Sequence, residues 1–148
     1  PEDAPIDLTG SQMIVFGMGR VGTSVYDTMN QKMPGAVIGV DFDHEVVMEH
    51  QGLGRNVIGG NATNPEFWDR VIMSPEIQYV LLVMPEHSAQ VAAIDQIRNH
   101  GFRGKIAATA KYPDELKKLH ALGVDAAFNI YAEVGTGFAS MASAKFDL

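Results

Sequence analysis

The chain has 148 residues and a mass of 16.0 kDa, a length that favours one domain with a core of its own. Hydrophobic residues make up 46% and charged residues 20%, which is typical of a globular protein and excludes a disordered one. The net charge of −7 disfavours binding to nucleic-acid phosphates, so we expect no nucleic-acid partner.

The chain has no cysteine, which excludes disulfides and thiol catalysis and is typical of a reducing compartment. No apolar run approaches the ~20 residues needed to cross a bilayer. The chain begins at Pro1 instead of Met, and its first residues are polar and lack the apolar stretch of a signal peptide. We therefore expect residues 1–11 to be a linker remnant from a larger protein, and residues 12–148 to form a single domain.

Short apolar runs alternate with helical patterns along the chain. The predicted strands are Met13–Phe16, Ala36–Val40, Asn56–Ile58, Tyr79–Met84, Lys105–Ala108 and Ala126–Ile130. The predicted helices are Val21–Lys32, His44–Gln51, one beginning at Asn64-Pro65, Glu86–Asn99, Pro113–Leu122 and Glu133–Lys145. Six βα units without a hairpin predict an α/β fold, a Rossmann-like, doubly wound, six-stranded parallel sheet with helices on both faces.

Two of the predicted helices carry patterns of further interest. The first has Val21, Val25 and Met29 at the spacing of one apolar stripe. The last is rich in small residues, with Val134 and Phe138 among its larger apolar positions. This last helix either packs on the sheet or forms an arm that meets another subunit, and the sequence leaves both possibilities open.

A glycine motif of the form GxGxxG joins the first predicted strand to the first predicted helix. Gly17 permits the tight turn, Gly19 lets a phosphate approach the backbone, and Gly22 allows the helix to pack against the sheet. The helix N-terminus then offers unpaired N–H groups to a phosphate. The motif predicts a nucleotide site, against the alternative of a structural turn without a ligand. Its residues are Gly17, Met18, Gly19, Arg20, Val21 and Gly22.

An acid, Asp41, ends the second predicted strand 19 residues after Gly22. At this position a carboxylate accepts hydrogen bonds from ribose hydroxyls and repels a 2′-phosphate, which favours an adenosine nucleotide or NAD over NADP. Phe42 either flanks an adenine ring or is a partly buried loop aromatic. Arg20 either reaches a phosphate or stays solvated.

Polar residues also follow the third predicted strand, in Gly60-Asn61-Ala62-Thr63. Because ligands of doubly wound sheets bind beyond the carboxyl ends of the strands, we expect Asn61 and Thr63 to face the crevice beside Gly19. Capping of the following helix is the alternative role. Met84 and Pro85, after the fourth strand, either line the pocket wall or simply end the strand.

The groups that catalysis requires are missing from the sequence. It contains neither a serine nucleophile elbow nor the Tyr-xxx-Lys pair of short-chain dehydrogenases, and its five histidines lack metal-ligand spacing. The polar cluster of Asp43, His44 and Glu45 is better explained by helix capping than by metal binding. We therefore predict neither catalytic residues nor a metal site. Lys111, after the fifth strand, either forms a salt bridge or touches a ligand or is a surface lysine, and the last interpretation is favoured.

The conjunction of these motifs resembles the RCK/KTN family, also called TrkA-N domains, over roughly residues 12–143. The family pattern has a GxGxxG turn, an acid ending the second strand and a Gly-Asp-Ala-Thr turn, where this chain has Asn61 in place of the aspartate. The resemblance implies a regulatory domain of potassium channels and transporters that binds AMP, ADP, ATP or NAD(H) without turnover. It also implies pairing of two domains and a transmembrane partner in the same chain or complex.

The segment order looks most like the C-terminal domain of Kef-type potassium efflux antiporters. The fifth strand ends Ala108-Thr109-Ala110-Lys111, without the arginine of many Kef-type members, so gating by glutathione is not carried over. The expected function is regulation of K⁺/H⁺ antiport, on the cytoplasmic side of the inner membrane. Alternatives are the cofactor domain of an NAD-dependent oxidoreductase and a ligand-free interaction module. The predicted nucleotide contacts are Gly17, Met18, Gly19, Arg20, Val21, Gly22, Asp41, Phe42, Asn61, Ala62, Thr63, Met84 and Pro85.

Overall fold

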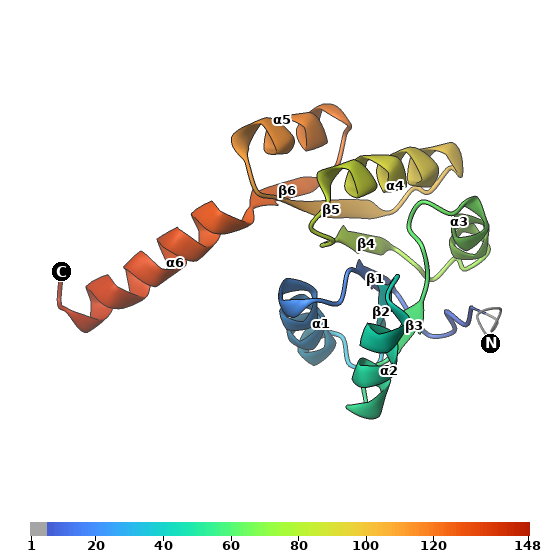
Figure 1. Ribbon diagram of the computed structural model, residues 1–148, viewed down its shortest axis with the longest axis horizontal. Helices are drawn as coiled ribbons and strands as arrows, with labels where there is room; N and C mark the ends of the chain where they lie inside the picture. The colour runs from blue at the N-terminus through green and yellow to red at the C-terminus, as the bar shows by residue number, and fades with distance from the viewer. Residues whose placement is uncertain (1–5) are drawn as a thin grey trace.

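The computed structural model describes residues 6–148 as six strands alternating with six helices (Figure 1). The strands are β1 (Met13–Phe16), β2 (Val37–Asp41), β3 (Val57–Gly59), β4 (Tyr79–Leu82), β5 (Lys105–Ala110) and β6 (Ala126–Asn129). The helices are α1 (Arg20–Lys32), α2 (His44–Gly52), α3 (Pro65–Ile72), α4 (His87–Asn99), α5 (Pro113–Ala121) and α6 (Ile130–Lys145). Within the described residues, no helix combines the length and apolar character needed to cross a membrane.

All the strands pair in parallel, in the order β3-β2-β1-β4-β5-β6. This order confirms the predicted Rossmann-like doubly wound sheet. Strand β1 lies at the centre, and its four residues are all buried. The chain reverses its direction of winding between β1 and β4, because the first half of the sheet is built outward on one side of β1 and the second half on the other.

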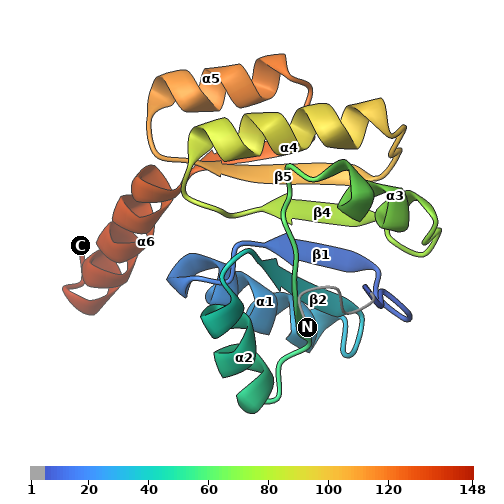
Figure 2. The same ribbon diagram turned by 45° about the vertical axis from the view of Figure 1, so that its right-hand side comes forward.

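Helices cover both faces of the sheet (Figure 2). Helices α1 and α2 pack on one face through Tyr26 and Val47, against Val15 and Val37 of the strands. The opposite face carries a larger cluster, to which α3, α4 and α5 contribute. Its largest fully buried side chains include Phe67, Trp68, Ile94, Ile97 and Leu119.

Several element boundaries differ from the prediction by one or two residues, and the start of α6 differs by three. Helix α6 begins at Ile130 instead of Glu133, because the Asn129 side chain caps it by accepting the N–H groups of Tyr131 and Ala132 at 3.0 and 3.1 Å. The predicted last strand therefore ends at Asn129. On α1, Val25 and Met29 of the predicted stripe pack against the core, whereas Val21 is exposed and Gly22 and Tyr26 are buried.

Helix α6 projects away from the rest of the domain (Figure 1). None of its residues is buried. Packing on the sheet of its own chain, one of the two possibilities that the sequence left open, is therefore not what the fold shows. Its exposed large apolar side chains are Tyr131, Val134, Phe138 and Met141.

The predicted linker, residues 1–11, lies partly outside the described residues, because the description begins at residue 6. Leu8 is buried in the larger cluster, and Ile6 packs against it. The Ser11 N–H donates to the Leu8 carbonyl oxygen at 3.0 Å. The boundary between residues 11 and 12 stays a prediction, but Ile6 and Leu8 belong physically to the domain.

Candidate functional site

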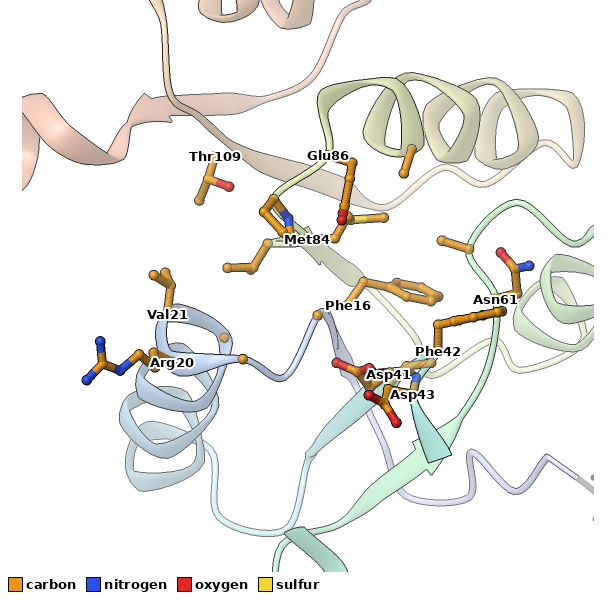
Figure 3. Close-up of a pocket in the computed structure, with 18 of the residues that line it drawn as sticks. Phe16, Arg20, Val21, Asp41, Phe42, Asp43, Asn61, Met84, Glu86 and Thr109 are labelled. Carbon is orange, nitrogen blue, oxygen red and sulfur yellow. Dashed lines mark hydrogen bonds between the residues drawn. The ribbon is translucent and has the colours of Figure 1, made fainter. Parts of the chain in front are cut away.

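A cavity of about 600 Å³ opens at the carboxyl ends of β1, β2 and β4, where the winding of the sheet reverses (Figure 3). Crevices at this position hold the ligands of doubly wound sheets, and the volume is in the range of small-molecule sites. Of the predicted nucleotide contacts, all but Met18 line the cavity. They are Gly17, Gly19, Arg20, Val21, Gly22, Asp41, Phe42, Asn61, Ala62, Thr63, Met84 and Pro85.

The three glycines of the GxGxxG motif, which runs from the end of β1 into the first turn of α1, have different surroundings. Gly17 has a φ of +96°, and a Cβ there would lie 2.7 Å from the backbone nitrogen of Met84. A Cβ on Gly22 would lie 1.6 Å from the carbonyl oxygen of Gly17. Around Gly19, in contrast, a Cβ would meet no atom within 4 Å. The fold itself requires glycine at the first and last positions, while the middle one leaves open backbone beside the cavity.

Asp41 joins the end of β2 to the glycine loop. Its Oδ2 accepts the N–H of Met18 at 2.7 Å, and its Oδ1 accepts the N–H of Asp43 at 2.8 Å. A carboxylate offers about four acceptor positions, so these two bonds leave room for two hydroxyl groups. Asp41 is thus both a structural link and an available acceptor at the cavity wall.

Met18 differs from the other predicted contacts. Its side chain is 1% exposed and packs over Gly39, where a Cβ would lie 2.6 Å from the Met18 sulfur. A glycine in β2 therefore makes room for this methionine in the core. Met18 supports the site through its peptide groups, and its side chain is a core residue.

The turn after β3 is held by its own side chains. The Oδ1 of Asn61 accepts both the N–H and the hydroxyl of Thr63, at 2.9 and 2.7 Å. The buried Trp68 indole donates to the Ala62 carbonyl at 2.6 Å. Asn64 caps α3 by accepting the N–H of Glu66 at 3.0 Å. Asn61 and Thr63 therefore shape the cavity wall and do not cap the helix.

Phe42 and Arg20 lie at the rim of the cavity (Figure 3). Phe42 is 79% exposed, so it is not the partly buried aromatic that the sequence offered as one alternative. The Arg20 guanidinium extends away from the centre of the site in Figure 3 and forms no ion pair with any described residue. Val21 beside it is 43% exposed and faces the same opening.

The cavity extends further than the sequence predicted, toward the ends of β5 and β6. Thr109, Lys111 and Glu115 line this part together with Ile130. Thr109 and Lys111 could have been predicted as lining residues, because they lie at the carboxyl end of β5 and therefore at the same edge of the sheet as the glycine loop. Ile130 was not predicted to line it, because it was assigned to a strand and is the first residue of α6.

The charged side chains near the site line the cavity or cap a helix. Among residues 6–148, no group of three His, Cys, Asp or Glu side chains is placed to hold a metal ion. Asp43 caps α2 by accepting the N–H of Glu45 at 2.9 Å, as predicted. Acidic residues outnumber basic residues among those that line the cavity. Binding of an anion here therefore depends mainly on backbone N–H groups at the start of α1.

The fold and the cavity define a Rossmann-like domain with its ligand crevice at the point where the winding reverses. The chain belongs to the TrkA-N domain family, whose model matches residues 13–130. This confirms the family that the glycine motif, Asp41 and the turn after β3 indicated. The comparison with curated proteins found no match.

Several solved structures share the fold. The NAD(P)-binding domain of an exopolyphosphatase-related protein from Archaeoglobus fulgidus superposes with a TM-score of 0.79 at 14% identity, over 90% of this chain and 98% of that one. The TrkA-N domain of the inner membrane protein ybaL from Escherichia coli gives 0.75 at 18% identity, over 92% and 98%. The GsuK structure bound to ADP gives 0.68 at 13% identity, over 86% of this chain and 32% of GsuK. A GsuK channel structure bound to NAD gives 0.65 at 13% identity, over 84% and 22%.

Proposed function

We propose that this chain is a regulatory domain of a potassium-transport protein that binds an adenine nucleotide or NAD(H) in the cavity without converting it. The observation that carries the proposal is the open backbone of Gly19 at the start of α1, beside the carboxylate of Asp41. Membership of the TrkA-N family supports it, as do the ADP and NAD bound by the structurally similar GsuK.

In this proposal each part of the nucleotide has a partner in the cavity. The phosphates lie at the N-terminus of α1, where backbone N–H groups and the helix dipole attract an anion. The ribose hydroxyls donate to the free acceptor positions of Asp41. The adenine ring packs against Phe42, whose exposed ring gains an apolar contact. AMP, ADP and ATP fit this half of the cavity, and NAD(H) extends toward Thr109 and Lys111.

The first prediction is selective binding in a calorimetric titration with AMP, ATP, NAD, NADH and NADPH. We expect an adenosine nucleotide or NAD(H) to bind and NADPH to bind at least about tenfold more weakly, because its 2′-phosphate meets Asp41. A preference for NADPH would contradict the assignment of Asp41. Absence of binding would make the glycine loop a structural turn and favour an interaction module. Hydride transfer with small alcohols should be absent, and robust turnover would favour the oxidoreductase alternative.

The expected setting is a transmembrane transporter domain in the same chain or complex, with residues 12–148 on the cytoplasmic side of the inner membrane. We propose that the transporter is a potassium efflux antiporter of the Kef type. Nucleotide binding biases transport only if the ligand has different affinities for two arrangements of the domains. The inner membrane protein ybaL offers a precedent for a TrkA-N domain that belongs to a membrane protein.

We also propose that the domain forms a homodimer through α6. The register places Ala107, Ala126 and Phe128 on the sheet face that α1 and α2 cover, but those helices cover only its β1–β3 half (Figure 2). Phe128 is 54% exposed there, and the apolar α6 continues from the same strand. A second copy buries both surfaces, which explains an apolar helix that contacts little of its own domain.

The test of this dimer is sedimentation of the protein and of Phe138→Asp. Phe138 is 73% exposed on α6, so the substitution is harmless in a monomer but places a charge in the proposed interface. We expect the wild type to be dimeric and the dimer dissociation constant of the variant to rise at least tenfold, or about 1.4 kcal/mol. Met48→Asp, at an exposed site on α2, is the matched control and should remain dimeric. A monomeric wild type at micromolar concentrations would overturn the proposal.

A further inference from the structure

The carbonyl group of Met18 lies outside the cavity and is held by two side chains. The Nε2 of His50, on α2, lies 2.8 Å from the Met18 oxygen. The hydroxyl of Thr23, on α1, donates to the same oxygen at 3.2 Å. His50 is 8% exposed, and neither it nor Thr23 lines the cavity. Side chains from two helices thus bind the same carbonyl oxygen of the glycine loop.

The surroundings of His50 fix which of its ring nitrogens carries the proton. A carbonyl oxygen only accepts hydrogen bonds, so the Nε2 of His50 must carry a hydrogen. The Nδ1 lone pair then faces the Nη1 of Arg55 at 3.2 Å, which donates to it. Arg55 is held in turn by two hydrogen bonds to Asp27, at 2.9 and 3.0 Å.

The pairing of Arg55 with Asp27 is the outer end of this chain of hydrogen bonds. The Arg55 hydrogen bonds lower the pKa of Asp27 below its ordinary value, with a smaller opposing effect from burial. Asp27 therefore stays ionised near neutral pH and keeps the guanidinium in place. The series Asp27–Arg55–His50 ends at the Met18 carbonyl oxygen.

Peptide geometry carries this restraint into the cavity. In a trans peptide, the carbonyl of one residue and the N–H of the next point in opposite directions, and the described chain has no cis peptide. A Met18 carbonyl held toward α2 therefore turns the N–H of Gly19 away from α2. Gly19 lines the cavity, and its N–H meets no acceptor among the described residues.

We propose that His50, assisted by Thr23, is a positioning residue that aims the N–H of Gly19 at the phosphate of the bound nucleotide. This inference rests on the proposed function. The N–H of Met18 is bound by Asp41 and its carbonyl by His50, so the backbone is restrained on both sides of the residue that precedes Gly19. A donor that is already oriented loses less entropy when the phosphate binds.

The test compares His50→Leu, His50→Gln and Val47→Ala by calorimetric titration with ADP. His50→Leu keeps the apolar contacts and removes the donor, so we expect about tenfold weaker binding. Glutamine presents an N–H group near the position of Nε2, and His50→Gln should bind within about threefold of the wild type. Val47→Ala loses a buried side chain from the same helix but removes none of the hydrogen bonds to the Met18 carbonyl, and should lower thermal stability while leaving affinity nearly unchanged.

A second measurement reports on the loop without a ligand. In ¹⁵N spectra of the free protein, His50 should show a protonated Nε2 and an unprotonated Nδ1, and the Gly19 amide should shift in His50→Leu but not in Val47→Ala. If His50→Leu fails to fold, Thr23→Val removes the other donor and should shift the same amide and weaken ADP binding about threefold.

The outcomes separate this inference from the proposed function. If the wild type does not bind ADP, the adenine nucleotide proposed as the ligand is wrong. The chemical shift of the Gly19 amide then still tests whether His50 positions this group. The opposite His50 tautomer, or an unchanged Gly19 amide, would overturn the inference. So would equal ADP affinities of the wild type and His50→Leu.

Discussion

Replacement of Gly22 by alanine is expected to destabilise the domain by about 3 kcal/mol and to abolish nucleotide binding. The added Cβ would lie 1.6 Å from the carbonyl oxygen of Gly17, and neither atom belongs to a flexible side chain. Helix α1 must therefore move away from the loop, which displaces the N–H groups at its start. Thermal unfolding should show a melting temperature lower by roughly 6–12 °C.

Gly19→Ala is the matched control for this prediction. Gly19 has a φ of −74°, and a Cβ there meets no atom within 4 Å. Because alanine is a poorer N-cap than glycine, we expect stability to fall by about 0.5–1 kcal/mol, while ADP affinity falls at least tenfold because the methyl group occupies the phosphate approach. Wild-type stability in Gly22→Ala would contradict the close packing of α1 on the loop. Wild-type affinity in Gly19→Ala would show that the phosphate binds elsewhere.

Replacement of Asp41 by alanine is expected to weaken binding of an adenosine nucleotide by about 1–3 kcal/mol, measured by titration calorimetry. Two effects contribute. The ribose loses its acceptor, and the N–H groups of Met18 and Asp43 lose theirs, which loosens the glycine loop. The second effect should also appear as reduced thermal stability, because a partly buried donor is left unpaired.

The ratio of NADPH to NADH affinity distinguishes these two effects. Loosening of the loop weakens the binding of both ligands alike. Removal of the Asp41 charge, in contrast, relieves repulsion of the 2′-phosphate that only NADPH carries. We expect the ratio to shift toward NADPH by at least about fivefold in Asp41→Ala. An unchanged ratio would mean that Asp41 faces no ribose and acts only as the structural link of the loop. Asp43→Ala removes the cap of α2 and a second carboxylate of the cavity wall but leaves Asp41 in place, and should shift the ratio less than Asp41→Ala.

The sequence predicted which residues line the inner half of the cavity, because local rules govern where they lie. Glycine spacing after a buried strand, an acid ending the next strand and a polar turn after the third each indicate the carboxyl edge of the sheet. Met18 shows the limit of such rules. Its place in the motif does not reveal that its side chain enters the core over Gly39, since this depends on a strand that pairs alongside.

Two features were not predicted from the sequence, namely the half of the cavity near β5 and β6 and the contact that holds the glycine loop from α2. Ile130 became a lining residue because Asn129 caps α6 early, a choice between strand and helix that periodicity alone does not make. His50 lies 32 residues from Met18 in the chain, and no spacing connects them. Only the packing of α2 beside the glycine loop brings this imidazole to the carbonyl.

The sequence by itself determined the order of strands and helices, the glycine motif and its acid, and the family to which the chain belongs. These follow from local periodicity, turn chemistry and motif spacing, which act within short stretches of chain. The tertiary structure decided which groups share a cavity wall or a hydrogen bond across helices. It also decided that α6 projects from the domain. An apolar helix packs on the sheet of its own chain only where a sheet face lies within its reach.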